Sequence, residues 1–347
     1  MSNSHGLLEF GVTRAATGAQ VVKAIRAQSW SSCAVTVIGY GVMGAHYVNA
    51  LRALGVSQIR VCSLSSQPLE ALRRSGKVRV ISGGFETFEG RSQPDELAII
   101  ATPTDRLVKA AGHLAMLGFR RLLIEKPVSL RSRAIEELAQ LLRQHGVDAA
   151  CAYNRVAYPS FREVVARAAE EGGIRSCVYT FTEMVKLDWP QRFPPEELAR
   201  WGIANSLHVI GMAHGLIGLP RHWNGYRTGG LPWHPAGGIF TGAGISECDI
   251  PFSYHADWQS TGRWSVEVHT AGASYRLCPL EQLFRRTSAL ADWEPVPLAA
   301  CAPQVKAGLA EEVAAMLSPE IRLLIPLVSL EQAAALTRYA EVLFGYE

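Results

Sequence analysis

The stretch Val35-Thr36-Val37-Ile38-Gly39-Tyr40-Gly41-Val42-Met43-Gly44 is an apolar run that leads directly into the pattern G-x-G-x-x-G. The β-branched residues predict a buried strand, and the apolar residues of 45–54 recur at helical spacing. Gly39 permits the tight turn off the strand, Gly41 lets the backbone approach a pyrophosphate, and Gly44 lets the helix pack close to the strand. The pyrophosphate would lie on free N–H groups at the positive end of that helix. A plain strand–turn–helix is the alternative, but this context favours a dinucleotide site.

The composition is that of a globular protein and excludes several function classes. The 347 residues are 48% apolar and 19% charged, and they carry a net charge of +3 with no long basic run. The sequence therefore has no basic segment that would attract nucleic acid. No apolar stretch approaches the length of a membrane span. The seven cysteines include no C-x-x-C pair. This predicts reduced thiols in a cytoplasmic compartment and argues against a zinc or other metal site.

Strand and helix patterns alternate up to residue 153. Continuous apolar runs at 97–102, 121–124 and 147–153 are typical of buried parallel strands, and helical patterns lie between them. This alternation predicts an α/β Rossmann domain, a doubly wound parallel sheet, over residues 33–153. Residues 1–32 have no signal-peptide core and are expected to be an N-terminal extension.

The pattern changes after residue 153. Residues 223–284 read as strands cut by glycine turns, and 264–269 alternate cleanly between apolar and polar residues. A helix carrying two histidines is expected at 200–216, and closing helices are expected near the C-terminus. We therefore expect residues 154–347 to form an α+β domain of mainly antiparallel sheet and helices, for substrate binding and oligomerisation.

The end of the second predicted strand bears on the choice of cofactor. A dinucleotide fold usually places an acidic residue there for the ribose hydroxyls, but this chain has Ser63, and Ser65 follows. The absence of a carboxylate removes the repulsion of a 2′-phosphate, and hydroxyl groups can donate to one. The serines could instead cap the next helix. NADP is the preferred cofactor, with NAD as the alternative.

Taken together, the motifs resemble those of the Gfo/Idh/MocA family, the oxidoreductases that include glucose–fructose oxidoreductase and inositol dehydrogenases. The resemblance runs from about residue 33 to the end of the chain. Besides the glycine pattern, it rests on Ala-Ile-Ile-Ala-Thr102-Pro103, Leu-Leu-Ile-Glu125-Lys126-Pro127, Tyr153-Asn154-Arg155, Asn205-Ser-Leu-His208 and a closing Ser-Leu-Glu-Gln-Ala-Ala-Ala-Leu.

The resemblance implies roles for several of these residues. Thr102, Pro103, Glu125 and Pro127 would line the cofactor site, and Lys126 would lie beside the nicotinamide and the reacting carbon. It also implies a cis bond before Pro127. An ammonium group there can stabilise negative charge on a substrate oxygen. His208 would be the acid/base, because imidazole titrates near neutrality. The alternative for His208 is a core histidine, and His214 is better interpreted that way.

The chain also departs from the family pattern. The family usually has an aspartate four residues before the histidine and an acidic residue three after it, where this chain has Ala204 and Gly211. Without a carboxylate, His208 lacks a group that would orient it and raise its pKa. Asn205 could hydrogen-bond the substrate instead.

The function predicted from these features is an NAD(P)-dependent dehydrogenase or reductase. It would transfer hydride between nicotinamide and a carbinol or ketone carbon of a sugar or sugar derivative, including nucleotide-linked sugars. Besides Asn205 and His208, the candidate substrate contacts are Arg155, Lys186, Asp188, Trp189 and Arg192. Two alternatives stay open: a lyase or glycosidase that uses the cofactor transiently, and a cofactor-binding regulatory protein without catalysis.

A homodimer or homotetramer built on the antiparallel sheet is also expected. The large apolar residues of the sheet region supply more apolar area than one covered face needs. These residues are Phe240, Ile245, Ile250, Phe252, Trp258 and Trp264.

Overall fold

The computed structural model describes residues 15–346, apart from 65, 75, 77, 94, 187 and 326. The described residues form two compact units. The Rossmann unit contains Val21–Ala157 and Ala300–Ala334, and the antiparallel unit contains Tyr158–Ala299, the residues from Ala335 onward and those up to Gln20. No helix among the described residues is long and apolar enough to cross a membrane.

The Rossmann unit is built on a seven-stranded sheet in the order β15-β6-β5-β4-β1-β2-β3. All neighbouring strands are parallel except β15, which is antiparallel to β6. The apolar residues of the central strands are fully buried, as a sheet covered on both faces requires; they are Val35, Val37, Ile38, Leu97–Ile100 and Leu122–Ile124. The strands are β1 (Ala34–Ile38), β2 (Gln58–Ser63), β3 (Arg79–Ser82), β4 (Leu97–Ile100), β5 (Arg121–Glu125), β6 (Asp148–Ala152) and β15 (Val328–Ser329).

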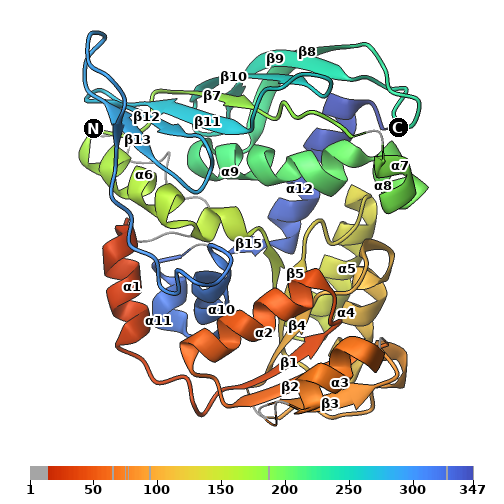
Figure 1. Ribbon diagram of the computed structural model, residues 1–347. Coiled ribbons are helices and arrows are strands. Elements are labelled where there is room, and N and C mark those ends of the chain that lie inside the picture. The colour runs from red at the N-terminus through yellow and green to blue at the C-terminus, as the bar shows by residue number, and fades with distance from the viewer. Residues whose placement is uncertain are drawn as a thin grey trace. The chain divides into compact units, whose positions relative to one another are not determined.

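Helices cover both faces of this sheet. Figure 1 shows α2 and α10 side by side on one face, with α4 and α5 on the other. The helices are α1 (Gly18–Arg26), α2 (Val42–Leu54), α3 (Ser66–Arg74), α4 (Leu107–Met116), α5 (Ser132–Gln144), α10 (Leu309–Leu317), α11 (Pro319–Arg322) and the start of α12 (Leu330–Phe344); short 3-10 turns are η1 (Phe85–Thr87), η2 (Thr104–Arg106) and η3 (Asn154–Ala157). The predicted doubly wound parallel sheet is confirmed.

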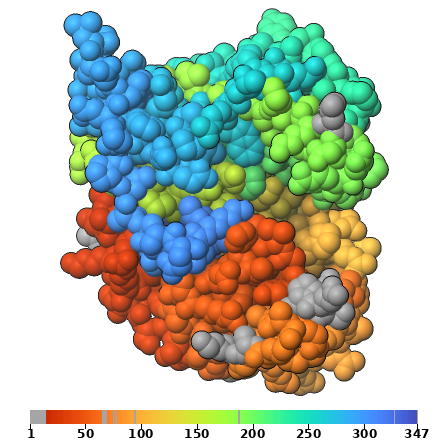
Figure 2. All heavy atoms as spheres, in the orientation of Figure 1, coloured from red at the N-terminus to blue at the C-terminus, as the bar shows by residue number. Residues whose placement is uncertain are grey.

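The division into continuous segments 33–153 and 154–347 differs from the observed units. Residues 300–334, expected in the second domain, belong to the Rossmann unit. β15 extends the parallel sheet at β6, and the atoms of 300–325 lie directly against those of α2 (Figure 2). The apolar side of α10 finds its buried partner on α2, and this packing is not encoded in the local pattern of either helix.

The antiparallel unit is built on an eight-stranded sheet in the order β14-β13-β12-β11-β7-β10-β9-β8. Only β7 and β10 pair in parallel, so the mainly antiparallel prediction is confirmed. The strands are β7 (Ser176–Thr180), β8 (Pro220–Thr228), β9 (Ile239–Ser246), β10 (Pro251–Asp257), β11 (Ser265–His269), β12 (Ser274–Leu277), β13 (Phe284–Arg286) and β14 (Glu294–Pro295).

Helices lie along one face of this second sheet. Figure 1 shows α6, α9 and the end of α12 below it. The helical elements are α6 (Pro159–Glu170), α7 (Trp189–Arg192), α8 (Pro195–Ala199), the π-helix η4 (Gly202–Ser206) and α9 (Leu207–Ile217). The single helix expected over 200–216 is therefore divided, because its first part has π-helical rather than α-helical hydrogen bonding.

The apolar residues expected to drive oligomerisation mostly belong to the core of the single chain. Phe240, Ile250, Phe252 and Trp258 are all buried within it. Of the six residues, only Ile245 is strongly exposed, at 39%. These four residues therefore supply no surplus apolar surface, contrary to expectation, because the helices under the sheet cover their face.

Candidate functional site

Most of the predicted cofactor residues lie at one edge of the parallel sheet. The strand order reverses between β1 and β4, and open α/β sheets bind ligands at such a switch point, outside the carboxyl ends of the strands. The segments that leave the strands at this edge are the glycine loop 39–44, Ser63, Thr102-Pro103, Lys126-Pro127 and 153–155.

The three glycines of the loop have different surroundings. Gly39 has φ +94°, and a Cβ there would collide with the carbonyl oxygen of Ala101. A Cβ on Gly44 would collide with the carbonyl oxygen of Gly39. A Cβ on Gly41 would meet no atom within 4 Å. The predicted roles of Gly39 in the turn and of Gly44 in close packing are therefore confirmed, and Gly41 leaves open space at the start of α2.

Two hydroxyl groups lie at this edge. The Oγ1 atom of Thr102 is buried and has no hydrogen-bond partner among the described residues. Ser63 is 7% exposed, and its Oγ accepts a hydrogen bond of 3.3 Å from the Tyr40 N–H in the glycine loop. A buried polar atom without a partner is costly, so the edge is suited to a polar ligand. Ser65 lies outside the described residues.

Lys126 follows β5 and adjoins a buried acid. The Lys126–Pro127 bond is cis, as the resemblance implied. Glu125 is 8% exposed and accepts a 2.7 Å hydrogen bond from the hydroxyl of Tyr47 on α2. Burial raises the pKa of Glu125, while the Tyr47 hydrogen bond and the charge of Lys126 lower it. Tyr47 thus holds the carboxyl group next to the lysine.

The returning segment adds two charged residues that sequence reasoning missed. Glu312 on α10 is 1% exposed. Burial raises the pKa of Glu312 well above its ordinary value, and the negative charge of Glu125 raises it further. Lys306 is exposed, and its Nζ donates to the Sδ of Met43 in the glycine loop at 3.3 Å. The sequence signal that could have identified Glu312 is a pair of adjacent glutamates in the otherwise apolar stretch 309–317.

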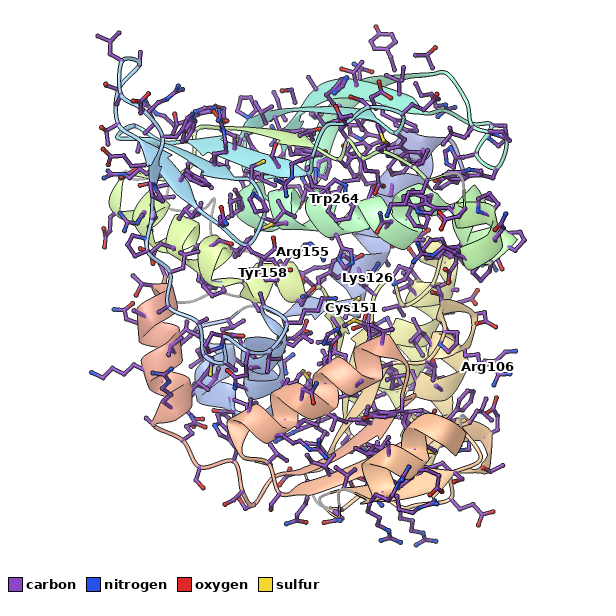
Figure 3. All side chains as sticks on the ribbon, in the orientation of Figure 1. Arg106, Lys126, Cys151, Arg155, Tyr158 and Trp264 are labelled. Carbon is purple, nitrogen blue, oxygen red and sulfur yellow. The ribbon has the colours of Figure 1, made fainter. Side chains whose placement is uncertain are left out.

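These groups set the charge state of Lys126. Burial lowers the pKa of Lys126 to about 8, the charge of Glu125 opposes this, and the charges of Arg155 and Lys306 add to it. Figure 3 shows Lys126, Arg155 and Cys151 gathered at this part of the unit. A lysine with this pKa can hold or release a proton near neutral pH.

The antiparallel unit holds the second group of predicted residues. His208 lies in the first turn of α9, half-buried, with its ring centroid 6.1 Å from that of Trp264. Asn205 in η4 donates hydrogen bonds of 3.1 and 3.0 Å to the two carboxylate oxygens of Glu183. Trp201 Nε1 donates to the same carboxylate at 2.8 Å. Glu183, a carboxylate missed in the sequence, therefore bonds a residue that lies three positions before His208.

His214 is a core residue, as predicted. It is fully buried, its Nδ1 lies 2.9 Å from the carbonyl oxygen of Gly218, and its Nε2 lies 3.2 Å from the Tyr179 hydroxyl. Burial lowers its pKa to about 4, against a weaker raising effect of the Gly218 hydrogen bond. The imidazole is neutral at physiological pH.

The loop proposed for substrate contact is partly internal. Trp189 is 9% exposed, and its ring centroid lies 4.5 Å from that of Trp201 in an aromatic cluster with Phe193 and Trp233. Asp188 and Arg192 form an exposed ion pair of 3.5 Å. Trp189 therefore supports the start of η4 by packing, and little of its surface is open to a ligand.

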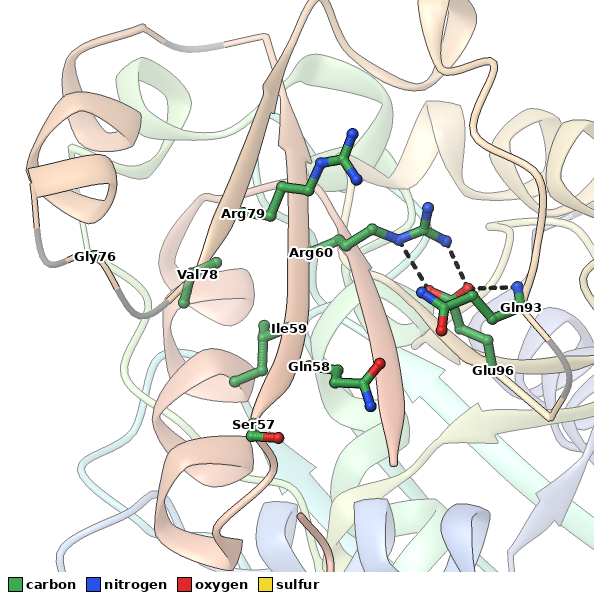
Figure 4. A pocket seen from close by; sticks show the side chains of 9 residues that line it. All are labelled: Ser57, Gln58, Ile59, Arg60, Gly76, Val78, Arg79, Gln93 and Glu96. Carbon is green, nitrogen blue, oxygen red and sulfur yellow. Dashed lines mark hydrogen bonds and ion pairs between the residues drawn. The ribbon is translucent and has the colours of Figure 1, made fainter. Parts of the chain in front are cut away.

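A separate pocket lies at the opposite, amino edge of the parallel sheet (Figure 4). It has a volume of about 450 Å³ and is lined by Ser57, Gln58, Ile59, Arg60, Gly76, Val78, Arg79, Gln93 and Glu96. Arg60 forms an ion pair with Glu96, with an N–O distance of 2.5 Å. Glu96 also accepts a hydrogen bond from the Thr36 hydroxyl. These contacts give the Arg60–Glu96 pair a structural role.

Among the described residues, no group of three or more acidic, histidine or cysteine side chains could hold a metal ion.

Comparisons with known proteins agree with this geometry. Residues 33–153 match the profile of the Gfo/Idh/MocA family, described as an oxidoreductase family with an NAD-binding Rossmann fold. No curated protein sequence matches the chain.

Solved structures resemble the chain over most of its length. UDP-N-acetylglucosamine 3-dehydrogenase GnnA from Acidithiobacillus ferrooxidans is 15% identical with a TM-score of 0.70, covering 90% of this chain and 96% of its own. Levoglucosan dehydrogenase in complex with NADH is 16% identical with a TM-score of 0.70, covering 90% and 96%. A dehydrogenase (MviM) from Clostridium difficile is 14% identical with a TM-score of 0.73, covering 91% and 100%. At these identities the likeness establishes the fold.

The parallel sheet, its switch point and the glycine loop are those of an NAD-binding Rossmann domain, and the matching family is one of oxidoreductases. The match to the Gfo/Idh/MocA family rests on this Rossmann domain, residues 33–153.

Proposed function

We propose that this protein is an NAD(P)-dependent dehydrogenase or reductase whose substrate is a sugar or a sugar derivative. The observation that carries the proposal is Lys126 at the switch-point edge, next to the buried Glu125–Tyr47 pair. Support for the substrate class comes from relatives of the same fold, which are named as dehydrogenases of UDP-N-acetylglucosamine and levoglucosan.

The residues at this edge fit a dinucleotide. Gly41 leaves space for a diphosphate at the start of α2, whose first N–H groups have no partner within the helix. Thr102 offers a buried hydroxyl without a partner among the described residues. Val42 and Leu64, at 77% and 62% exposure, offer apolar surface at the same edge. The cofactor would supply or accept a hydride at its nicotinamide ring.

Each unit contributes one side chain with a proposed catalytic role. The Lys126 ammonium group donates a hydrogen bond to the substrate's oxygen and stabilises the negative charge that develops there. His208 gives or takes the proton, as general acid–base catalysis requires. Asn205 can offer only its amide oxygen to a substrate, because its NH₂ group donates to Glu183.

Steady-state turnover with both cofactors and a sugar panel tests this function. The panel should include UDP-N-acetylglucosamine, levoglucosan and myo-inositol, each with NAD⁺ and NADP⁺, and the matching ketones with the reduced cofactors. Net change in nicotinamide absorbance with one substrate supports the proposal. Product formation without net redox change would instead indicate the lyase or glycosidase alternative, and cofactor binding without turnover would indicate a regulatory protein.

We infer a preference for NADP(H) over NAD(H), because Ser63 carries no charge at the end of β2. Ser63→Asp should weaken NADP(H) binding about tenfold or more and leave NAD(H) binding little changed, because a carboxylate repels the 2′-phosphate. A carboxylate can still accept the Tyr40 N–H bond, which preserves the loop. Tryptophan fluorescence titration with both cofactors measures this.

The matched control for this change is Ser57→Asp, which adds the same charge beside the amino end of the same strand. It should leave both affinities unaltered. Equal binding of the two cofactors by the wild-type protein, or tighter binding of NAD(H), would refute the preference.

We also propose a homodimer or homotetramer formed through the open face of the antiparallel sheet. Val178, Ile245 and Tyr226 are 47%, 39% and 78% exposed on that face. Val178→Glu should convert the oligomer to monomers, because it buries an unpaired charge in the interface. Light scattering at micromolar concentration measures the mass. Met116→Glu, at an exposed position of the Rossmann unit, should leave the mass unchanged, and a monomeric wild-type protein would disprove the interface.

The compartment is proposed as cytoplasmic. All seven cysteines are free in the structure, which is compatible with a reducing environment.

A further inference from the structure

The π-helix η4 immediately precedes His208 and carries Asn205. π-helical turns are rare, because their hydrogen bonding is less favourable than that of an α-helix, and they occur often at functional sites. Such a turn persists only when its surroundings hold it. The contacts around Gly202–Ser206 therefore identify residues that set the position of the following helix.

The first anchor is the hydroxyl group of Tyr346. His234 Nδ1 lies 2.7 Å from the carbonyl oxygen of Gly237, so Nδ1 carries the proton and Nε2 is an acceptor. Nε2 lies 2.6 Å from the Tyr346 hydroxyl, which must therefore donate to it. The tyrosine oxygen is then oriented to accept the Gly202 N–H at 2.9 Å. The Gly202 N–H group, at the start of η4, therefore donates its hydrogen bond to a side chain 144 positions later in the chain.

Packing keeps this hydroxyl in place. The Tyr346 ring stacks on Phe344 with centroids 5.6 Å apart, and Phe344 stacks on the fully buried Trp258 at the same separation. A Cβ on Gly202 would collide with the Phe344 ring, so only glycine allows this approach. The Arg200 guanidinium lies 5.3 Å from the centre of the Tyr346 ring. Two side chains of the C-terminal segment, Phe344 and Tyr346, thus lie against the start of η4.

The second anchor is Glu183, which follows β7. Its carboxylate accepts from Trp201 Nε1 before η4 and from the Asn205 amide within it. Hydrogen bonds to a charged group are worth about twice those between neutral groups. η4 is therefore held at its start by a neutral contact to Tyr346 and along its length by a charged contact to Glu183.

We propose that Tyr346 and Glu183 are positioning residues that hold η4 in its π-helical form and thereby orient Asn205 and His208. The inference rests on the proposed function for the role of His208, but the clamp itself depends only on contacts within the antiparallel unit. Neither residue needs to touch substrate or cofactor.

Tyr346→Phe tests the clamp, because it removes only the hydroxyl and keeps the stacked ring. Hydrogen exchange by mass spectrometry should show exchange of the 202–206 amides accelerated by about tenfold or more, since local opening becomes easier. Tyr275→Phe is the matched control, because it removes a hydroxyl of the same unit that donates to Glu171 rather than to η4. Unchanged exchange at 202–206 in Tyr346→Phe would overturn the proposal.

Kinetics test the positioning role. In Tyr346→Phe and in Glu183→Gln, kcat should fall by about tenfold with KM for the cofactor unchanged, and the ionisation that His208→Asn removes should move in the pH profile. A lowered melting temperature with wild-type kcat and pH profile would reduce both residues to structural support. If the wild-type protein turns over no substrate, the proposed function fails, whereas the exchange experiment still decides the clamp.

Discussion

Lys126→Ala should lower kcat by about 10³-fold or more while changing the dissociation constant of NAD(P)(H) by no more than about twofold. The lysine would act on the substrate's oxygen, whereas the backbone of the glycine loop and the first turn of α2 would hold the diphosphate. Stopped-flow or steady-state turnover and fluorescence titration measure the two quantities separately. Lys109→Ala, at an exposed position of α4, is the control and should alter neither.

The pH profile gives this prediction a second readout. Burial lowers the pKa of Lys126 to about 8, so the ammonium form predominates below about pH 8 and is lost above it. In the direction of carbonyl reduction the rate should therefore fall as pH rises through this value. Lys126→Arg keeps a charge across the whole range, so any residual activity should lack this fall. Wild-type kcat in Lys126→Ala would remove the residue from the mechanism.

His208→Asn should lower kcat by about 10² or more, the usual scale of general acid–base catalysis. Asparagine is close to histidine in size and polarity, so packing near Trp264 should survive. The ionisation near neutral pH should disappear from the profile of kcat. Turnover at varied pH measures both effects.

His214→Asn is not a matched control for this change, because His214 is buried and bonded on both ring nitrogens. His222→Asn, at an exposed position of β8, is suitable and should leave kcat unaltered. A His208→Asn variant with wild-type kcat and pH profile would reduce His208 to packing and leave Lys126 as the only catalytic side chain proposed here.

The missing aspartate at position 204 has a structural counterpart. Glu183, which follows β7, bonds Asn205 and Trp201, so a carboxylate contacts this turn although the helix itself carries none. The π-helical geometry of η4 also changes which residues share a face with His208. A four-residue spacing counted on an α-helix therefore does not describe this turn.

Local chemistry was readable in the sequence by itself. The glycine loop, the buried parallel strands and the Glu-Lys-Pro segment are short-range patterns, because turn geometry and burial on both faces impose residue types over a few adjacent positions. They determined the Rossmann sheet, the switch-point edge and the place of Lys126 on it. His214 was likewise recognisable as a core residue.

Only the tertiary structure decided which distant groups surround those residues. Glu312 and Lys306 reach the Lys126 region because 300–334 returns to the first unit, and Tyr346 reaches Gly202 across 144 positions of the chain. The same folding buried Trp189 and most of the apolar residues expected at an interface. Contacts of this kind depend on packing between elements rather than on local periodicity, and the pKa of Lys126 depends on burial and charges that exist only after those elements have met.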